Sequence, residues 1–295
     1  MKEIKKYIIL IICLLIINGC DNPVPTELVQ DEEQLEVEVI TKDIDDEFYE
    51  ADSSGVVGDY KRFTNIISVS GIKITHGDTT LTTSYAQAIF FDRGNPILRG
   101  NGNILSYRTR LLGNVKFNDV EAKRVSHIIR YREGGVVKDV NLGLKHVLNS
   151  AFPGNDFNYQ FNASVSFDLD FLLGNTVSFN IPTPTEVFGN VKFEGERGNE
   201  NLKTILNWNA ENLPGFEIVI SARERDGDKV LPLYRIKTSD DGELILPAKL
   251  INEIPIRFKR IIFNFVRKYD SLQSGNNNQL YVLSQSIHSV VIDIP

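Results

Sequence analysis

From about residue 60 to the C-terminus, apolar and polar residues alternate with a period of two in one short stretch after another. The clearest stretch is 157–171, in which eight apolar residues alternate strictly with seven polar ones. The apolar positions are Phe157, Tyr159, Phe161, Ala163, Val165, Phe167, Leu169 and Phe171. Because successive side chains of a strand point to opposite faces, this stretch predicts a long β-strand with one apolar and one polar face.

The rest of the first half predicts more strands and one helix. Strands are expected around 104–111, 114–120, 124–132 and 135–140, separated by turn-forming Gly and Asn residues. Apolar residues then fall at i, i+3, i+4 and i+7, at Leu144, Val147, Leu148 and Ala151. This spacing predicts a helix over 143–152, which Pro153-Gly154 would end.

The second half contains seven stretches with strand character. They lie at 189–194, 202–209, 215–223, 231–238, 242–246, 256–268 and 279–294. The sixth stretch changes parity, because Ile256 and Phe258 alternate in one phase and Ile261 and Phe263 in the other. We expect a β-bulge near Lys259-Arg260, or a strand that is buried on both faces.

A stiff segment separates the two halves. The sequence Ile181-Pro182-Thr183-Pro184-Thr185 favours an extended backbone and is the expected domain boundary. The fold class is therefore mostly β, with one or two short helices and two β domains. The N-terminal β domain is expected at 56–181, and 182–295 has the length of an immunoglobulin-type antiparallel sandwich.

Two segments of the second domain carry a family resemblance. Leu206-Asn207-Trp208-Asn209-Ala210, followed by 216–220, resembles the strand pairs of Ig-like and fibronectin-III-like modules. The stretch 240–247, followed by Leu250 and Pro255, is similar to a hairpin that leads into a one-turn helix in Ig-like domains of bacterial envelope lipoproteins. The resemblance implies an Ig-like fold for about a third of the chain, and the family has no assigned activity to transfer.

Residues 1–19 have the features of a secretory signal peptide. Lys residues precede an unbroken apolar run at 7–17, which is shorter than a membrane-spanning helix requires. The tetrapeptide Ile17-Asn18-Gly19-Cys20 resembles a bacterial lipobox, although Asn18 replaces the Ala, Ser, Thr or Val that is usual there. The resemblance implies that Cys20 becomes the lipid-bearing, palmitoylated N-terminus of the mature chain. Ordinary secretion without an anchor is the alternative.

Acidic residues are concentrated directly after this signal. The whole chain has a net charge of −7, and residues 21–52 hold thirteen acidic residues but a single basic one, Lys42. This composition predicts that 20–55 consists of the lipidated Cys20 and a solvated acidic tether. Val37 and Val39 alternate with Glu residues, so a first strand can begin within it. The remaining body is close to neutral, which argues against nucleic acid as a partner.

Few residues are candidates for metal binding or catalysis. Both cysteines, Cys13 and Cys20, lie in the signal region, so the mature chain would lack disulfides, thiolate nucleophiles and cysteine metal sites. The four histidines form no metal-binding pair in sequence and are expected on the surface. They are His76, His127, His146 and His288.

Asp168 and Asp170 are weak candidates for a metal site or for an acid and base pair. They share the polar face of the 157–171 stretch, roughly 6–7 Å apart along a strand. Such a pair could hold Ca²⁺ or act on glycosidic bonds, but it also simply continues a solvated face. The basic residues of 256–268, among them Arg267 and Lys268, are likewise expected to be solvated. No catalytic set of residues and no cofactor is predicted.

These observations favour a lipid-anchored binding or structural module of the cell envelope, with an unknown ligand. The lipid on Cys20 would attach it to a membrane, and the outer membrane is expected, on its periplasmic or its surface side. An envelope protein or a glycan is the expected partner. The alternatives are an exported enzyme that acts on glycans or peptides, and an accessory subunit of an envelope assembly that docks through a strand edge.

Overall fold

The computed structural model describes residues 36–39, 65–134, 136–150, 157–172, 174–213, 215–224, 230–275 and 278–294. Residues 36–295 form one compact unit. In the described residues almost every regular element is a strand, and the single helix is one short turn. The predicted fold class, mostly β with little helix, is confirmed. The predicted signal peptide, Cys20 and most of the acidic tether lie outside the described residues.

The elements follow each other along the chain in two groups. The first group is β1 (Glu36–Val39), β2 (Asn65–His76), β3 (Thr79–Leu98), β4 (Ile104–Thr109), β5 (Gly113–Phe117), β6 (Val120–Glu121), β7 (Lys123–Glu133), β8 (Val136–Asn149), β9 (Ser164–Phe171) and β10 (Thr176–Pro182). The second group is β11 (Gly189–Glu194), β12 (Lys203–Trp208), β13 (Phe216–Glu224), β14 (Val230–Thr238), β15 (Glu243–Leu246), α2 (Ala248–Asn252), β16 (Phe258–Gly275) and β17 (Asn278–Asp293).

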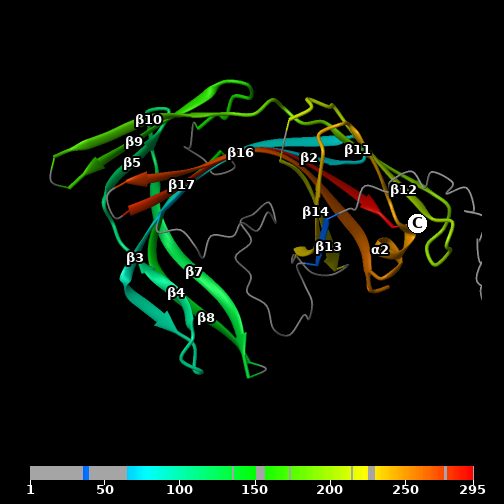
Figure 1. The fold of residues 1–295 in the computed structure, drawn as a ribbon, viewed down its shortest axis with the longest axis horizontal. Helices are drawn as coiled ribbons and strands as arrows, with labels where there is room; N and C mark the ends of the chain where they lie inside the picture. The colour runs from blue at the N-terminus through cyan, green and yellow to red at the C-terminus, as the bar shows by residue number, and fades with distance from the viewer. Residues whose placement is uncertain are drawn as a thin grey trace, which may run out of the picture. The chain divides into compact units, whose positions relative to one another are not determined.

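A ten-stranded sheet, here called the large sheet, connects both groups (Figure 1). Its strand order is β1-β14-β13-β16-β17-β2-β3-β8-β7, and β4 pairs with β3 outside this path. Neighbouring strands are antiparallel except β17 and β2, which run parallel from Leu280 opposite Asn65 to Val291 opposite His76. The strands of the two predicted domains, 56–181 and 182–295, therefore share one sheet.

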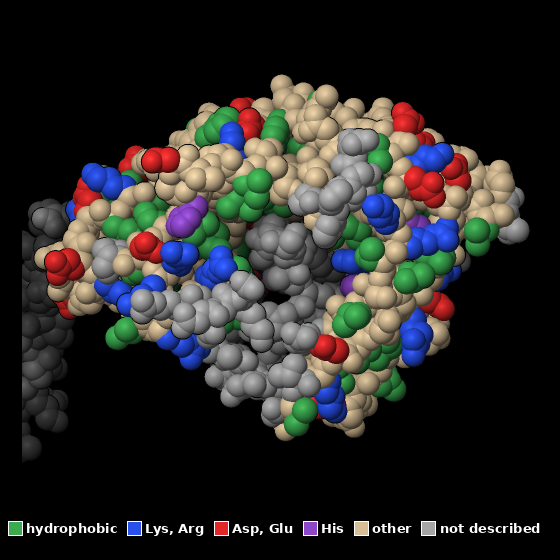
Figure 2. Space-filling model, turned by 180° about the vertical axis from the view of Figure 1, so that it is seen from behind, with side chains coloured by type: hydrophobic (Ala, Val, Ile, Leu, Met, Phe, Trp, Pro, Cys, Tyr) green, Lys and Arg blue, Asp and Glu red, His purple; other side chains and the backbone are tan. Residues whose placement is uncertain are grey.

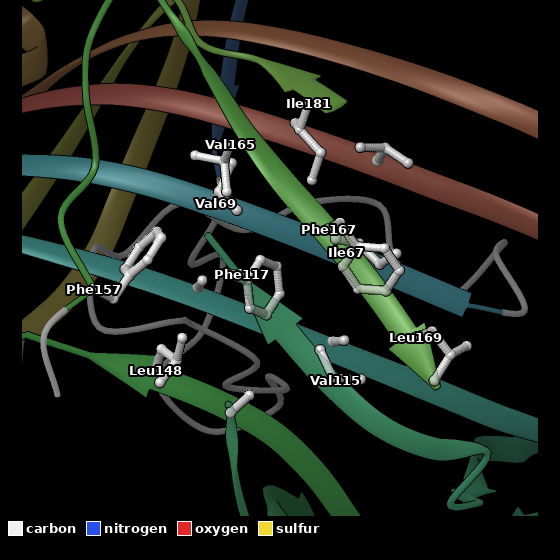
Figure 3. Packing of buried hydrophobic residues seen from close by; sticks show 14 of the residues in the cluster. Ile67, Val69, Val115, Phe117, Leu148, Phe157, Val165, Phe167, Leu169 and Ile181 are labelled. Carbon is white, nitrogen blue, oxygen red and sulfur yellow. The ribbon is translucent and has the colours of Figure 1, made fainter. Parts of the chain in front are cut away.

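A four-stranded sheet of order β10-β9-β5-β6 packs on one face of the large sheet. The odd-numbered residues Ile67 and Val69 of β2 meet Val115 and Phe117 of β5 in a buried cluster (Figure 3). Phe167 of β9 packs edge-on against Phe117, with ring centroids 5.5 Å apart. We call the face of the large sheet that this cluster occupies the covered face.

A three-stranded sheet of order β11-β12-β15 packs against the second group of strands in the large sheet. Trp208 of β12 stacks on Phe216 of β13 with ring centroids 4.6 Å apart. Gly189 lies so close to Phe265 of β16 that a Cβ at this position would come within 2.1 Å of the ring. The apolar alternation of the sequence therefore builds two layers here, because each sheet buries one face against the other.

All seven strands predicted for the second half are present. β16 continues to Gly275, seven residues beyond the predicted end at 268, and the other ends shift by at most two residues. The predicted bulge is confirmed: the register of β13 against β16 shifts between Arg223, which is opposite Arg260, and Glu224, which is opposite Phe258. Phe258 and Ile261 are both buried because the bulge places them on the same side. The predicted one-turn helix is α2, and the strand predicted within the tether is β1.

Two predictions for the first half need correction. The helix over 143–152 is wrong, because residues 143–149 belong to strand β8. Leu148 packs on the covered face and Val147 on the opposite face, so adjacent apolar residues arise from burial on both sides. The predicted strand 157–171 is shortened to β9, because Asn162 has a left-handed backbone with φ of 51° and ends the extended run.

Candidate ligand-binding face

Asp168 and Asp170 lie side by side on the outer face of β9, as the alternation predicts. Thr176 of β10 donates a hydrogen bond to Asp170 over 2.8 Å, and Lys116 of β5 forms an ion pair with Asp170 at 3.2 Å. Ser178 hydrogen-bonds to Asp168. Both carboxylates therefore take part in cross-strand polar pairs on an accessible sheet surface.

The pKa of Asp170 lies below its ordinary value, because Thr176 and then Lys116 stabilise the carboxylate. A cation would have to compete with the ammonium group of Lys116 for the same oxygen. Within the described ranges, no three His, Cys, Asp or Glu side chains are grouped closely enough to hold a metal ion. The structure thus brings Asp168 and Asp170 together with hydroxyl groups and a lysine.

The prediction that the histidines lie on the surface is correct for His76 but wrong for His127, His146 and His288, which are buried. Burial lowers the pKa of His127 and of His146 to about 4, and the nearby charges of Lys145 and Arg124 act in the same direction. An imidazole that loses its water on folding favours the neutral form.

His288 is held by two hydrogen bonds. The Gly189 backbone N–H donates to its Nδ1 over 2.7 Å, so Nε2 carries the proton and faces Thr75 Oγ1 at 2.9 Å. Burial and Lys73 lower the pKa of His288. This ring attaches the start of β11 to the large sheet, which is a structural role.

Arg267 was expected on a solvated strand and is instead fully buried. Its Nε and Nη2 donate to the two oxygens of Asp240 over 2.8 and 3.0 Å, and Nη2 also donates to the Asn209 carbonyl over 2.6 Å. Trp208 Nε1 donates to the same carboxylate over 2.9 Å. This pair has no signal in the sequence, because its members are far apart along the chain and Asp240 resembles an ordinary turn residue.

Another set of buried polar residues lies on the face of the large sheet that is opposite to the covered face. Ile67 and Val69 point into the covered face, so Ser68 and Ser70 point away from it. Ser68 is opposite Gln87 of β3, and Ser70 lies between Tyr85 of β3 and Gln285 of β17. We call these five residues, Ser68, Ser70, Tyr85, Gln87 and Gln285, the polar cluster. All five are buried.

Hydrogen bonds join Ser70 to Gln285 and Tyr85 to Gln87 within the polar cluster. Ser70 Oγ donates to Gln285 Oε1 over 3.3 Å, and Tyr85 OH donates to Gln87 Oε1 over 3.1 Å. Lys145 Nζ of β8 donates to the same Gln87 oxygen over 3.2 Å. Gln285 is only 1% exposed, and its Nε2 has no hydrogen-bond partner among the residues that the structure describes. An unpaired buried amide N–H₂ is a group that calls for an acceptor.

Apolar residues flank the polar cluster on both sides. One flanking group contains Ile66, Ile89 and Leu283, and the other contains Ile72, Val266 and Ile287. Small-molecule sites have this composition, a mostly apolar lining with a few polar groups that fix orientation. The polar cluster and its flanking residues therefore have the composition of a site for an uncharged ligand.

The polar cluster has no arrangement for nucleophilic catalysis. The hydroxyl of Ser70 donates to the amide oxygen of Gln285, which is too weak a base to remove its proton. On the same face, beyond β17, Lys268 Nζ and Glu217 Oε1 form an ion pair at 2.5 Å. Figure 2 shows Lys and Arg side chains on both sides of the view, with Asp and Glu side chains among them.

None of the described helices is both long and apolar enough to cross a membrane. No family model, no curated protein and no solved structure is similar to this chain.

Proposed function

We propose that this protein is a lipid-anchored protein of the cell envelope that acts as a binding module. Its ligand on the polar cluster is a small uncharged molecule rich in hydroxyl or amide groups, such as a glycan fragment. Residues 1–20 support the proposed location in the cell envelope, because a signal-like apolar run is followed there by a lipobox-like tetrapeptide with Cys20. The unpaired amide of Gln285 is the observation that supports the binding function.

The chemistry of the polar cluster favours a neutral ligand over an ion. Its side chains are two amides, two serine hydroxyls and one phenol, all of which are uncharged donors and acceptors. The Lys145 ammonium group is already hydrogen-bonded to Gln87. Sugar hydroxyls and acetamido groups present alternating donors and acceptors that match such a set, and their apolar ring faces match the flanking aliphatic residues.

We also propose that residues 182–295 form an Ig-like sandwich within this larger unit. Of its seven strands, the first, second and fifth form one sheet, β11-β12-β15. The remaining four, β14-β13-β16-β17, are consecutive neighbours in the large sheet. Sandwiches of the immunoglobulin type divide their strands between two packed sheets in a similar manner. The stacking of Trp208 on Phe216 between the layers supports the same assignment.

Thermal unfolding in the presence of defined saccharides tests the binding function. A ligand at a hundred times its Kd stabilises a protein by about 2.7 kcal/mol, which raises Tm by on the order of 5 °C for a chain of this size. We expect at least one member of a panel of mono- and disaccharides, including N-acetylated ones, to produce such a rise. A panel that leaves Tm unchanged would contradict the proposed ligand class.

A matched pair of variants links the effect to the polar cluster. Gln285→Leu keeps an aliphatic side chain of similar length but removes the amide, so the saccharide-induced rise in Tm should disappear. Gln160→Leu makes the same change at an exposed position and should keep the rise. If Gln285→Leu responds to the saccharide as the unaltered chain does, the polar cluster is not the site.

A further inference from the structure

Strand β14 would be an edge of the large sheet without the four residues of β1. β1 pairs antiparallel with Tyr234–Lys237 only, although β14 extends from Val230 to Thr238. Residues 40–64 connect β1 to β2. An edge strand presents a row of backbone N–H and C=O groups that can pair with another strand. The β14 edge can therefore pair with any strand that reaches it, and β1 covers only part of its length.

The described side chains of β1 match their partners on β14. Glu38 is opposite Arg235, and Arg235 Nη1 donates to Glu38 Oε2 over 2.9 Å. Glu36 is opposite Lys237 in the register, and Val37 is opposite the buried Ile236. The β14 edge thus favours a strand that places an acidic residue opposite Arg235 and an aliphatic residue opposite Ile236.

Arg235 gives the edge a specific need for a carboxylate. Its side chain is only 12% exposed, and its Nε and Nη2 are buried without a hydrogen-bond partner among the described residues. Glu217 lies 3.9 Å from Nε, but this carboxylate already forms a closer ion pair with Lys268 at 2.5 Å. Without Glu38, the guanidinium would keep only the distant and shared Glu217, and burying an incompletely paired charge is unfavourable.

We propose that the β14 edge is a docking site for an acidic extended strand, and that β1 of a second copy of this chain occupies it by strand exchange. The contacts in the exchanged form are the same as within one chain, so the choice between them depends on the effective concentration of the tethered strand. Reciprocal exchange closes a two-fold dimer, which uses the same edge on both copies. A four-residue strand whose Glu38–Arg235 ion pair is partly exposed holds weakly enough to exchange.

Cysteine trapping tests this proposal in the full-length chain, because its only native cysteines, Cys13 and Cys20, can be replaced by Ser. One copy carries Glu36→Cys and another carries Lys237→Cys, which are opposed residues in the β1–β14 register. Opposed Cα atoms of antiparallel strands lie within the range that a disulfide spans. Mild oxidation of the mixture should give a covalent heterodimer, seen by non-reducing electrophoresis and mass spectrometry.

Two comparisons show whether the dimer uses the proposed contact. In the control, the acceptor copy carries Asp78→Cys in place of Lys237→Cys. Asp78 is exposed in the turn after β2, so the yield of disulfide-linked dimer with this variant measures the random background. Arg235→Glu in the acceptor copy should lower the specific yield at least tenfold, and Glu38→Arg in the donor copy should restore it. Circular dichroism confirms that the variants fold. A yield equal to the Asp78→Cys background, or one that Arg235→Glu does not change, would overturn the proposal.

Discussion

His146 makes the stability of this protein sensitive to acid in a way that can be calculated. The ring is 1% exposed on the covered face, and neither ring nitrogen has a hydrogen-bond partner among the described residues. It packs edge-on against Phe90, with centroids 6.1 Å apart, and next to Arg124 in the β7–β8 register. Burial lowers the pKa of His146 from 6.5 to about 4, and Arg124 acts in the same direction.

Acid lowers the folding stability because the folded and unfolded chains bind the proton at different pH values. Between pH 6.5 and 4 the unfolded chain binds a proton at this ring and the folded chain does not, so stability is lost as the pH falls through this window. From pH 7.5 to 5.0, a histidine with these two pKa values loses about 2 kcal/mol of folding free energy. Below pH 4 the loss levels off at about 3.4 kcal/mol.

We expect His146→Leu to remove this part of the acid sensitivity. The variant should lose about 2 kcal/mol less than the unaltered chain between pH 7.5 and 5.0, measured by urea unfolding at both values. At pH 7.5 it should be at least as stable, because leucine leaves no unsatisfied ring nitrogens in the interior. His127, whose pKa is also about 4, supplies an independent second share.

His76→Leu is the matched control, since His76 is exposed at the end of β2 and keeps its water when the chain folds. It tests whether the loss of any histidine produces the same change. If His146→Leu loses as much stability as the unaltered chain on going to pH 5.0, the reasoning is refuted. An NMR titration in which the His146 ring protonates near pH 6.5 in the folded protein would refute it equally.

Two further predictions concern the buried ion pair and the anchor. Asp240→Leu leaves the Arg267 guanidinium buried without its carboxylate and should lower the free energy of unfolding by about 3–5 kcal/mol, measured by urea unfolding. The double variant Asp240→Leu with Arg267→Met should lower the free energy of unfolding less, and a double variant less stable than the single one would contradict this prediction. Cys20→Ser should abolish palmitate labelling and release the protein from the membrane fraction, with Cys13→Ser as the control that keeps both; unchanged labelling of Cys20→Ser would exclude the anchor.

Strands with local, regular alternation were the part of the fold that the sequence predicted well. β11 to β15 follow from apolar residues at every second position, and the parity change between Phe258 and Ile261 identified the bulge in β16. These signals are local, because the period of a strand depends only on its own backbone geometry. The helix predicted over 143–152 was wrong because a local pattern does not show how many faces of a strand are buried. β8 is buried on both faces, so Val147 and Leu148 imitate a helical spacing.

The pairing of β17 with β2 had no local signal. These strands come from opposite ends of the chain and run parallel, so no hairpin turn or short connection indicates that they are neighbours. The polar cluster depends on this pairing, because it places Gln285 next to Ser70. A candidate site built from both ends of the chain is visible only when the order of the strands in the sheet is known.

Polar residues in alternating strands mark a face, but they do not show whether that face is wet. Asp168 and Ser70 occupy equivalent positions in the pattern, since each alternates with apolar neighbours along a strand. The structure leaves Asp168 at the accessible surface of the four-stranded sheet and buries Ser70 almost completely. Burial of an unpaired amide such as that of Gln285 costs stability, whereas an apolar residue there would not, so its presence is the best reason to look for a ligand at this face.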